Sequence, residues 1–174
     1  MTTTLLDETG IKRAITRMAH EIIETYQGDK ELALIGIQTR GVFIARRLCD
    51  EIKKTEGQHL PCGELDINLY RDDWTRISHQ PVVRPTEIPF EVTDRRVLLV
   101  DDVLYTGRTI RAAMDALMDF GRPASIGLAV LVDRGHREFP IQADFIGKKV
   151  ESAYRQHVNV MLSEHDGSDH VTLT

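Results

Sequence analysis

The 174-residue chain has only two cysteines, few aromatic residues (6%) and no long apolar run. Cys49 and Cys62 can form neither a disulfide framework nor a metal-ligand spacing, so we expect both to be reduced packing residues. A membrane-spanning helix needs ~20 consecutive apolar residues, which the sequence lacks. The start, MTTTLLDETG, has no basic segment followed by an apolar one, so no secretory signal is predicted. We therefore expect a cytoplasmic protein with no membrane partner.

An excess of basic residues is also absent. The 22 lysines and arginines are outnumbered by 27 aspartates and glutamates, which gives a net charge of −5. This balance argues against binding nucleic acid over the whole surface, but it leaves room for one basic patch. With 41% hydrophobic residues, the chain can bury a core without disulfides or metal ions. We expect residues 1–174 to form one domain.

Hydrophobic periodicity predicts alternating helices and strands. The expected helices cover residues 7–27, 42–55 and 110–120, and the expected strands cover 32–37, 65–70, 97–100 and 126–132. Apolar strands separated by amphipathic helices are typical of an α/β fold with a mainly parallel central sheet. The remainder, residues 144–174, contains short strand-like pieces.

The segment from Arg71 to Pro89 is charged and contains three prolines. A loop of this length within a compact domain is often an active-site lid. A plain surface β-hairpin is the alternative, and both interpretations can hold together.

Three polar clusters, 39–41, 101–109 and 133–137, directly follow expected strands. Ligands of parallel sheets bind at the carboxyl ends of the strands, so these clusters are predicted to converge on one site. In the central cluster, Asp101 and Asp102 end a buried strand, and a glycine-containing turn leads into a helix. Carboxylates suit sugar hydroxyls, and a helix N-terminus suits a phosphate, so the expected ligand is a phosphorylated ribose. A coincidental acidic pair is the alternative, which the cost of burying two unpaired carboxylates disfavours.

The stretch VLLVDDVLYTGRT, Val97 to Thr109, closely resembles the phosphoribosyl-diphosphate (PRPP) motif of type I phosphoribosyltransferases. The chain further resembles the bacterial PyrR family, which regulates pyrimidine operons and also has uracil phosphoribosyltransferase activity. The resemblance includes AITRMAHEIIE, IGIQTRGVFIARRL, GELDINLYRDD and LAVLVDRGHREFPIQADFIGK. It covers most of the chain from about Leu6 to Lys149, and it implies the type I phosphoribosyltransferase fold with a lid and a small C-terminal hood.

The resemblance also implies roles for individual residues. Asp101 and Asp102 would hold the ribose hydroxyls, and Arg40 would join them in catalysis. The implied substrate-binding residues are Thr39, Arg40, Gly41, Asp101, Asp102, Val103, Leu104, Tyr105, Thr106, Gly107, Arg108, Thr109, Arg134, Arg137 and Val158. Thr39 to Gly41 would hold pyrophosphate, Tyr105 to Thr109 the 5′-phosphate, and Arg134, Arg137 and Val158 would lie by uracil.

The implied reaction joins uracil N1 to ribose C1 and releases pyrophosphate, giving UMP. Mg²⁺ would be held mainly by PRPP and diphosphate oxygens, so no protein metal site is expected. Purine enzymes typically resemble EDIIDTG here and have an acid at the position of Tyr105. A phenol with a pKa of ~10 is a poor base at neutral pH, which favours a pyrimidine.

The first helix carries a polar stripe of Arg13, Thr16, Arg17 and His20. Composition alone favours a solvated helix face. The resemblance implies instead that this stripe, extended by Lys148 and Lys149, binds pyrimidine-operon leader RNA. Bound UMP would then raise RNA affinity and promote transcription termination. A dimer or larger homo-oligomer would help to assemble such a basic surface.

Two other functions remain open on these observations. The chain could be an RNA-binding regulator whose pocket only senses nucleotide, or a salvage enzyme with no RNA role. The C-terminal turn with His165, Asp166, Asp169 and His170 could suggest a metal site, but a hydrophilic hairpin is the preferred interpretation.

Overall fold

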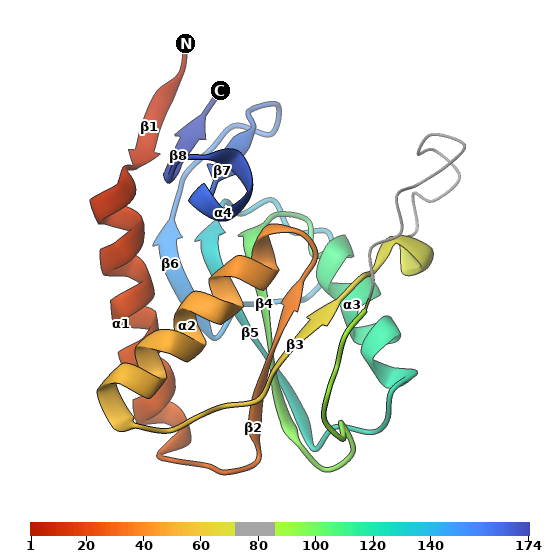
Figure 1. The fold of residues 1–174 in the computed structure, drawn as a ribbon. Coiled ribbons are helices and arrows are strands. Elements are labelled where there is room, and N and C mark those ends of the chain that lie inside the picture. The colour runs from red at the N-terminus through yellow and green to blue at the C-terminus, as the bar shows by residue number, and fades with distance from the viewer. Residues whose placement is uncertain (72–85) are drawn as a thin grey trace.

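A computed structural model describes residues 1–71 and 86–174 as an α/β sandwich (Figure 1). Its elements are β1 (Thr3–Leu6), α1 (Glu8–Tyr26), β2 (Leu32–Ile37), α2 (Arg40–Glu56), β3 (Cys62–Leu65), the 3₁₀ helix η1 (Asn68–Tyr70), β4 (Arg96–Leu104), α3 (Arg108–Met118), β5 (Ser125–Asp133), β6 (Phe145–Lys149), β7 (Val158–Met161), α4 (Ser163–Asp166) and β8 (His170–Leu173). Strands β3-β2-β4-β5-β6 form one parallel sheet in that order, which confirms the expected fold class.

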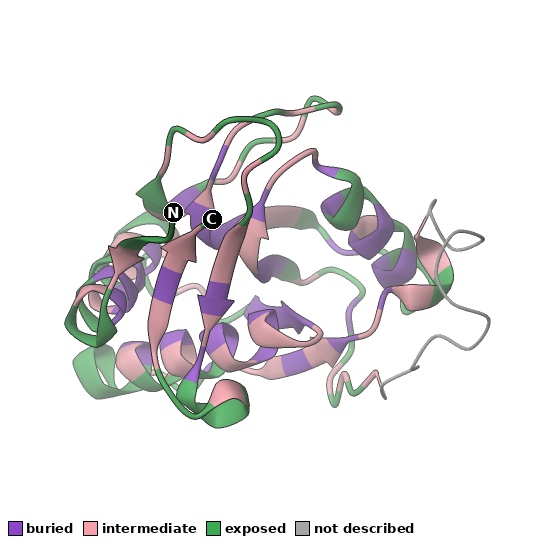
Figure 2. Ribbon diagram, turned by 90° about the horizontal axis from the view of Figure 1, so that it is seen from above, coloured by how far each residue is buried: buried purple, intermediate pink, exposed green. Residues whose placement is uncertain are grey.

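Two hydrophobic clusters fill the two sides of this sheet. Helices α1 and α2 pack on one face and α3 on the other. Every residue of β2 is buried, as expected for a strand that is covered on both faces. The helices place buried residues along one side and exposed residues along the other (Figure 2). Within the described residues, no helix is both long and apolar enough to span a bilayer.

The ends of the helices match the expected signals. Asp7 caps α1, and its side chain accepts a hydrogen bond of 2.7 Å from the Gly10 N–H. Helix α1 ends at Tyr26, where Gln27 takes the left-handed conformation ahead of Gly28. Helix α2 begins two residues earlier than predicted, so that Arg40 and Gly41 form its first turn.

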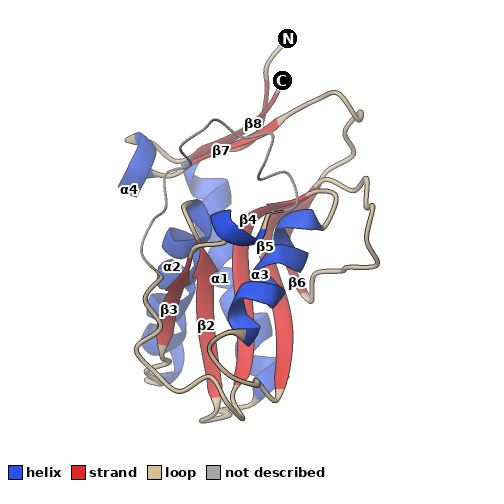
Figure 3. Cartoon of the chain, turned by 90° about the vertical axis from the view of Figure 1, so that its right-hand side faces the viewer, coloured by secondary structure: helices blue, strands red, loops and turns tan. Residues whose placement is uncertain are grey.

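A small antiparallel sheet forms the hood above the strand ends (Figure 3). Its order is β1-β8-β7, so the N-terminal strand is one of its members. The prediction of a purely C-terminal hood was therefore incomplete. Thr3 pairs with Leu173, which places the two ends of the chain side by side.

The strand predicted over 65–70 is wrong for most of its length. Strand β3 ends at Leu65, and residues 68–70 form η1. The Asp66 side chain accepts a hydrogen bond of 3.1 Å from the Asn68 N–H, and this turn competes with a continuing strand. Most of the predicted lid, 71–89, lies outside the described residues. On its C-terminal side, Glu87 forms an antiparallel bridge with Glu64.

Candidate functional site

Three of the parallel strands deliver the predicted polar clusters to one edge of the sheet. Strand β2 leads into Thr39–Gly41, β4 ends at Leu104, and β5 ends at Asp133. Leu104 and Asp133 are register partners, and the Arg134 N–H donates to the Leu104 carbonyl at 3.1 Å. The hood lies over the same edge (Figures 1 and 3). The clusters therefore meet, as their positions in the sequence predicted.

Asp101 and Asp102 differ in burial although they are neighbours in sequence. Asp101 is 6% exposed, whereas Asp102 is half-buried. Each carboxylate accepts the backbone N–H of the next residue, at 2.8 Å. Burial, followed by the nearby charge of Asp102, raises the pKa of Asp101 well above its usual range. Val103 is half-buried and Leu104 is buried, so these two residues mainly complete the strand.

The turn after β4 is shaped to lead into α3. Gly107 has a φ of 94°, a conformation that glycine adopts without strain, and α3 begins at the next residue. The Thr106 hydroxyl accepts the Arg108 N–H at 3.3 Å. Thr109 is exposed in the first turn of α3. The Arg108 side chain forms an ion pair with Glu138, 3.1 Å away. Free backbone N–H groups at a helix N-terminus are of the kind that can bind an anion.

The Thr39–Gly41 segment lies against β4. A Cβ atom on Gly41 would lie 2.4 Å from the Val100 carbonyl oxygen, so only glycine allows this approach. Arg40 forms a two-bond ion pair with Asp166 of α4. It also lies within electrostatic reach of Asp102, and both carboxylates raise the pKa of Arg40, with Asp166 the larger influence.

Arg134 and Arg137 play different roles in the structure. Arg137 is fully engaged: it forms an ion pair with Asp133 at 2.7 Å and donates to the Tyr105 carbonyl at 2.9 Å. It therefore braces the turn after β4 against the turn after β5. Arg134 is 5% exposed, and its guanidinium carbon lies 4.0 Å from the centre of the Tyr105 ring. The buried Nε of Arg134 has no hydrogen-bond partner among the described residues, so it is a donor that a ligand oxygen would satisfy.

Tyr105 belongs to an aromatic cluster with His136 and Tyr154. The Tyr105 ring centre lies 6.0 Å from each of the other two. Its hydroxyl donates to the Tyr154 carbonyl at 3.2 Å. Desolvation and the neighbouring Tyr154 raise the pKa of the Tyr105 phenol, which keeps it neutral near pH 7. Val158, at the start of β7, is half-buried and packs against the hydrophobic cluster on the α1–α2 side.

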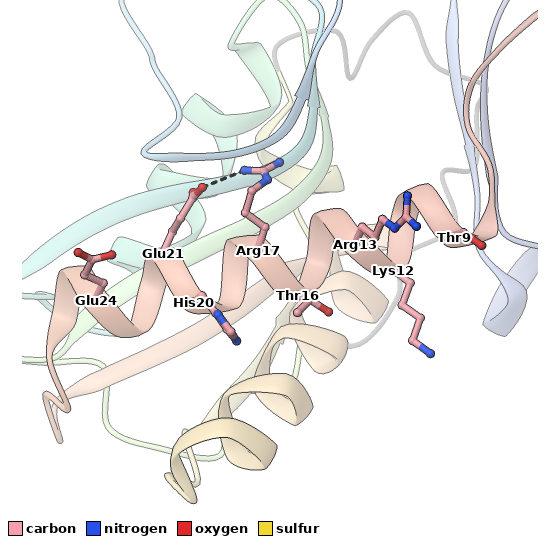
Figure 4. A pocket seen from close by; sticks show the side chains of 8 residues that line it. All are labelled: Thr9, Lys12, Arg13, Thr16, Arg17, His20, Glu21 and Glu24. Atoms are coloured by element: carbon pink, nitrogen blue, oxygen red, sulfur yellow. Dashed lines mark hydrogen bonds and ion pairs between the residues drawn. The ribbon is translucent and has the colours of Figure 1, made fainter.

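Helix α1 presents the polar stripe along an open surface groove of about 570 Å³ whose lining residues all belong to this helix (Figure 4). Arg13, Thr16, Arg17 and His20 all line it. Arg17 forms an ion pair with Glu21 and donates to two carbonyls of β6, those of Ile146 and Gly147. Arg17 therefore fastens α1 to the sheet edge. Arg13 and His20 make no hydrogen bond or ion pair with any described residue, so the Arg13 guanidinium and the His20 ring nitrogens remain available to a ligand.

Lys148 and Lys149 are both exposed near the end of β6. Successive side chains of a strand point to opposite faces of the sheet. By this alternation at most one of the two lysines lies on the α1 side of the sheet, and their expected part in RNA binding stays a prediction.

The donor atoms at the strand edge suit a cation that is shared with a substrate. In the described part of the chain, no three histidine, cysteine, aspartate or glutamate side chains gather as a metal cage. Asp101 and Asp102 supply hard carboxylate oxygens at the end of β4. Such a pair fits Mg²⁺ that keeps most of its ligands from phosphate oxygens and water.

Sequence reasoning missed the acidic partners of α2. Asp166 bonds to Arg40, while Glu164 and Asp169 bond to Arg47. Asp166 and Asp169 had been assigned to a hydrophilic hairpin, and neither they nor Glu164 had been paired with an arginine. They lie more than 110 positions from their partners, so no local pattern could reveal the contacts.

Comparisons with known proteins agree with this arrangement of the site. Residues 1–165 match the Phosphoribosyl transferase domain family. "Bifunctional protein PyrR" of Pelotomaculum thermopropionicum is 57% identical over 97% of this chain and 93% of its own length. "Bifunctional protein PyrR" of Deinococcus radiodurans is 56% identical over 98% and 93% of the two chains.

Solved structures show the same fold at much lower identity. A hypoxanthine phosphoribosyltransferase from Staphylococcus aureus has a TM-score of 0.71 at 20% identity, covering 97% of this chain and 90% of its own. The enzyme from Trypanosoma cruzi has a TM-score of 0.74 at 19% identity, covering 97% and 89%. At these identities the likeness concerns the fold alone. The near full-length match to the curated relatives is more specific, and the chain belongs to the PyrR family of phosphoribosyltransferases.

Proposed function

We propose that the chain transfers the phosphoribosyl group of PRPP to uracil, which forms UMP and releases diphosphate. One observation carries this proposal: the Asp101–Asp102 pair ends β4 one short turn before the N-terminus of α3. A ribose 5-phosphate spans the space between carboxylates, which accept hydrogen bonds from sugar hydroxyls, and helix N–H groups, which bind a phosphate. Membership of the PyrR family supports the same reaction.

The residues at the strand edge have distinct tasks in this reaction. Asp101 and Asp102 hold the ribose hydroxyls, while Tyr105 to Thr109 hold the 5′-phosphate. Thr39, Arg40 and Gly41 hold the diphosphate, and Arg40 stabilises the charge that develops on the leaving group. Mg²⁺ bound with PRPP would supply further neutralisation of that charge.

Two features favour uracil over a purine as the acceptor base. Tyr105 occupies the position of the purine enzymes' acid, and its neutral phenol cannot take a proton from a purine ring. The unpartnered Nε of Arg134 provides a buried donor beside Tyr105 for a ring carbonyl oxygen. Uracil has two such oxygens.

The direct test is turnover with Mg²⁺ and PRPP, with uracil and hypoxanthine compared as acceptors. We expect UMP to form with uracil and no nucleotide to form with hypoxanthine. Nucleotide formation from hypoxanthine alone would contradict the base assignment. Failure with both bases, together with tight UMP binding, would favour the regulator whose pocket only senses nucleotide.

A second function, binding of pyrimidine-operon leader RNA under the control of UMP, is favoured by the groove on α1. It offers the free charge of Arg13 and the free donors of His20 to phosphates and unpaired bases. Its test is a gel shift of the organism's own leader RNA with and without UMP. We expect UMP to tighten binding. No binding under either condition at low salt would leave a salvage enzyme.

A further inference from the structure

Arg40 occupies an unusual place for a cation. It is the first residue of α2, where the helix dipole and the free N–H groups favour negative charge. Its side chain is 28% exposed, so water screens the guanidinium only in part. A carboxylate nearby is therefore needed to stabilise the guanidinium in this position.

Asp166 supplies that carboxylate in a side-on geometry. The Arg40 Nε donates to Oδ2 at 3.0 Å, and Nη2 donates to Oδ1 at 2.7 Å. Asp166 is itself fixed, because its Oδ2 also accepts the Leu162 N–H at 2.9 Å and its side chain is 13% exposed. Nη1 of Arg40 bonds to no described residue. The side-on pair thus uses one edge of the guanidinium and leaves the other for a ligand.

A separate ion-pair cluster attaches the hood to α2. Arg47, two helical turns after Arg40, bonds to Glu164 at 2.6 Å and to Asp169 at 2.8 Å. Helix α4 therefore carries two carboxylates with different partners on α2, Asp166 for Arg40 and Glu164 for Arg47. Removing one charge leaves the other contact in place.

We propose that Asp166 is a positioning residue for diphosphate: it fixes one edge of the Arg40 guanidinium so that Nη1 faces the leaving group of PRPP. The inference rests on the proposed function, because it assigns Arg40 to that group. It extends the site to α4 of the hood, which the sequence motifs do not include. The hood then contributes to the diphosphate side of the site as well as to the base side.

The test compares Asp166→Asn with Glu164→Gln, which is matched in chemistry and lies on the same helix. Calorimetry measures the affinity of each variant for inorganic pyrophosphate with Mg²⁺ and, separately, for UMP, which lacks a diphosphate. We expect Asp166→Asn to weaken pyrophosphate binding about tenfold, with UMP binding unchanged. Asp166→Asn is also expected to raise the KM for PRPP and to leave the KM for uracil unchanged. Glu164→Gln is expected to bind both ligands as the parent does.

Three results would overturn the proposal. Equal affinity of Asp166→Asn and the parent for pyrophosphate would mean that Asp166 does not position Arg40. Tighter binding by Asp166→Asn would mean that Asp166 competes with the ligand for Arg40. Alternatively, pyrophosphate and UMP affinities could fall together, as a displaced hood would cause. Because pyrophosphate binding is measured without turnover, a parent that binds pyrophosphate but makes no UMP would contradict the proposed function and leave this inference standing.

Discussion

At the scale of single residues, the two adjacent aspartates differ in burial, and Asp101 is the one that affects stability through its charge. Asp101 is buried, and its raised pKa means that the folded state favours the protonated carboxyl. Stability from this group is complete below its unfolded pKa of ~4 and is lost as pH rises through the folded value. We predict that Asp101→Asn, which cannot ionise, increases the free energy of unfolding at pH 8 by on the order of 1 kcal/mol.

Urea denaturation at pH 8 and at about pH 3, below the unfolded pKa, tests this prediction. The gain from Asp101→Asn should shrink toward zero at the lower pH, because the parent carboxyl is then protonated in both states. An equal gain at both pH values would mean that its cause is packing and not charge.

Asp102 is half-buried and available to a ligand. We predict that Asp102→Asn remains folded but loses UMP formation by about 100-fold or more, because the ribose hydroxyls lose a charged acceptor. Circular dichroism checks the fold, and steady-state kinetics checks the loss. Normal turnover by folded Asp102→Asn protein would remove Asp102 from the site.

The sequence predicted which residues gather at the strand edge, but it could not separate their tasks. Arg134 and Arg137 were grouped as base-binding residues. The structure engages Arg137 with Asp133 and the Tyr105 carbonyl, whereas Arg134 keeps a buried free donor. This difference depends on side-chain directions, which a linear pattern does not contain.

At the scale of elements, the approach of α2 to the sheet sets the position of the Thr39–Gly41 segment, which we propose holds diphosphate. A Cβ on Gly36 of β2 would lie 2.5 Å from the Val42 Cα, inside any real contact distance. We predict that Gly36→Ala displaces the first turn of α2, costs about 1–3 kcal/mol of stability and weakens pyrophosphate binding.

Gly63→Ala in the neighbouring strand is the matched control. Its new Cβ would meet its nearest atom, the Glu87 carbonyl oxygen, at 3.3 Å, which small shifts can relieve. Thermal unfolding and pyrophosphate calorimetry should therefore change much less than for Gly36→Ala. Equal losses in the two variants would contradict the proposed role of the α2 approach.

The long apolar elements were predictable because the spacing of their hydrophobic residues matches the side of each helix or strand that is buried. Strands β2, β4 and β5 and helices α1 to α3 all follow the expected pattern within a few residues. The shorter elements were not. Strand β1 has only four residues and gains its partner, β8, from the other end of the chain.

At the scale of the whole molecule, a net charge of −5 requires RNA to bind on a local surface. We predict that Arg13→Gln lowers affinity for leader RNA and reduces the slope of log affinity against log salt by about 1, with uracil turnover unchanged. Arg111→Gln, on α3 across the sheet, is the control because it removes an exposed charge from the opposite face. Equal effects of the two variants would exclude a localised RNA surface. Self-association remains a prediction from the sequence.

The hood also determines how the molecule would respond to a pulling force. Its edge strand β1 is antiparallel to the central strand β8, and Thr3 lies opposite Leu173, so force applied to the chain ends acts across the hydrogen bonds of β1 and β8. Hydrogen bonds loaded in this unzipping geometry break one after another, whereas bonds loaded in shear resist the force together. In a single-molecule stretching experiment, the hood would open in a first step at low force. The five parallel strands, with β4 at their centre, would give way only afterwards.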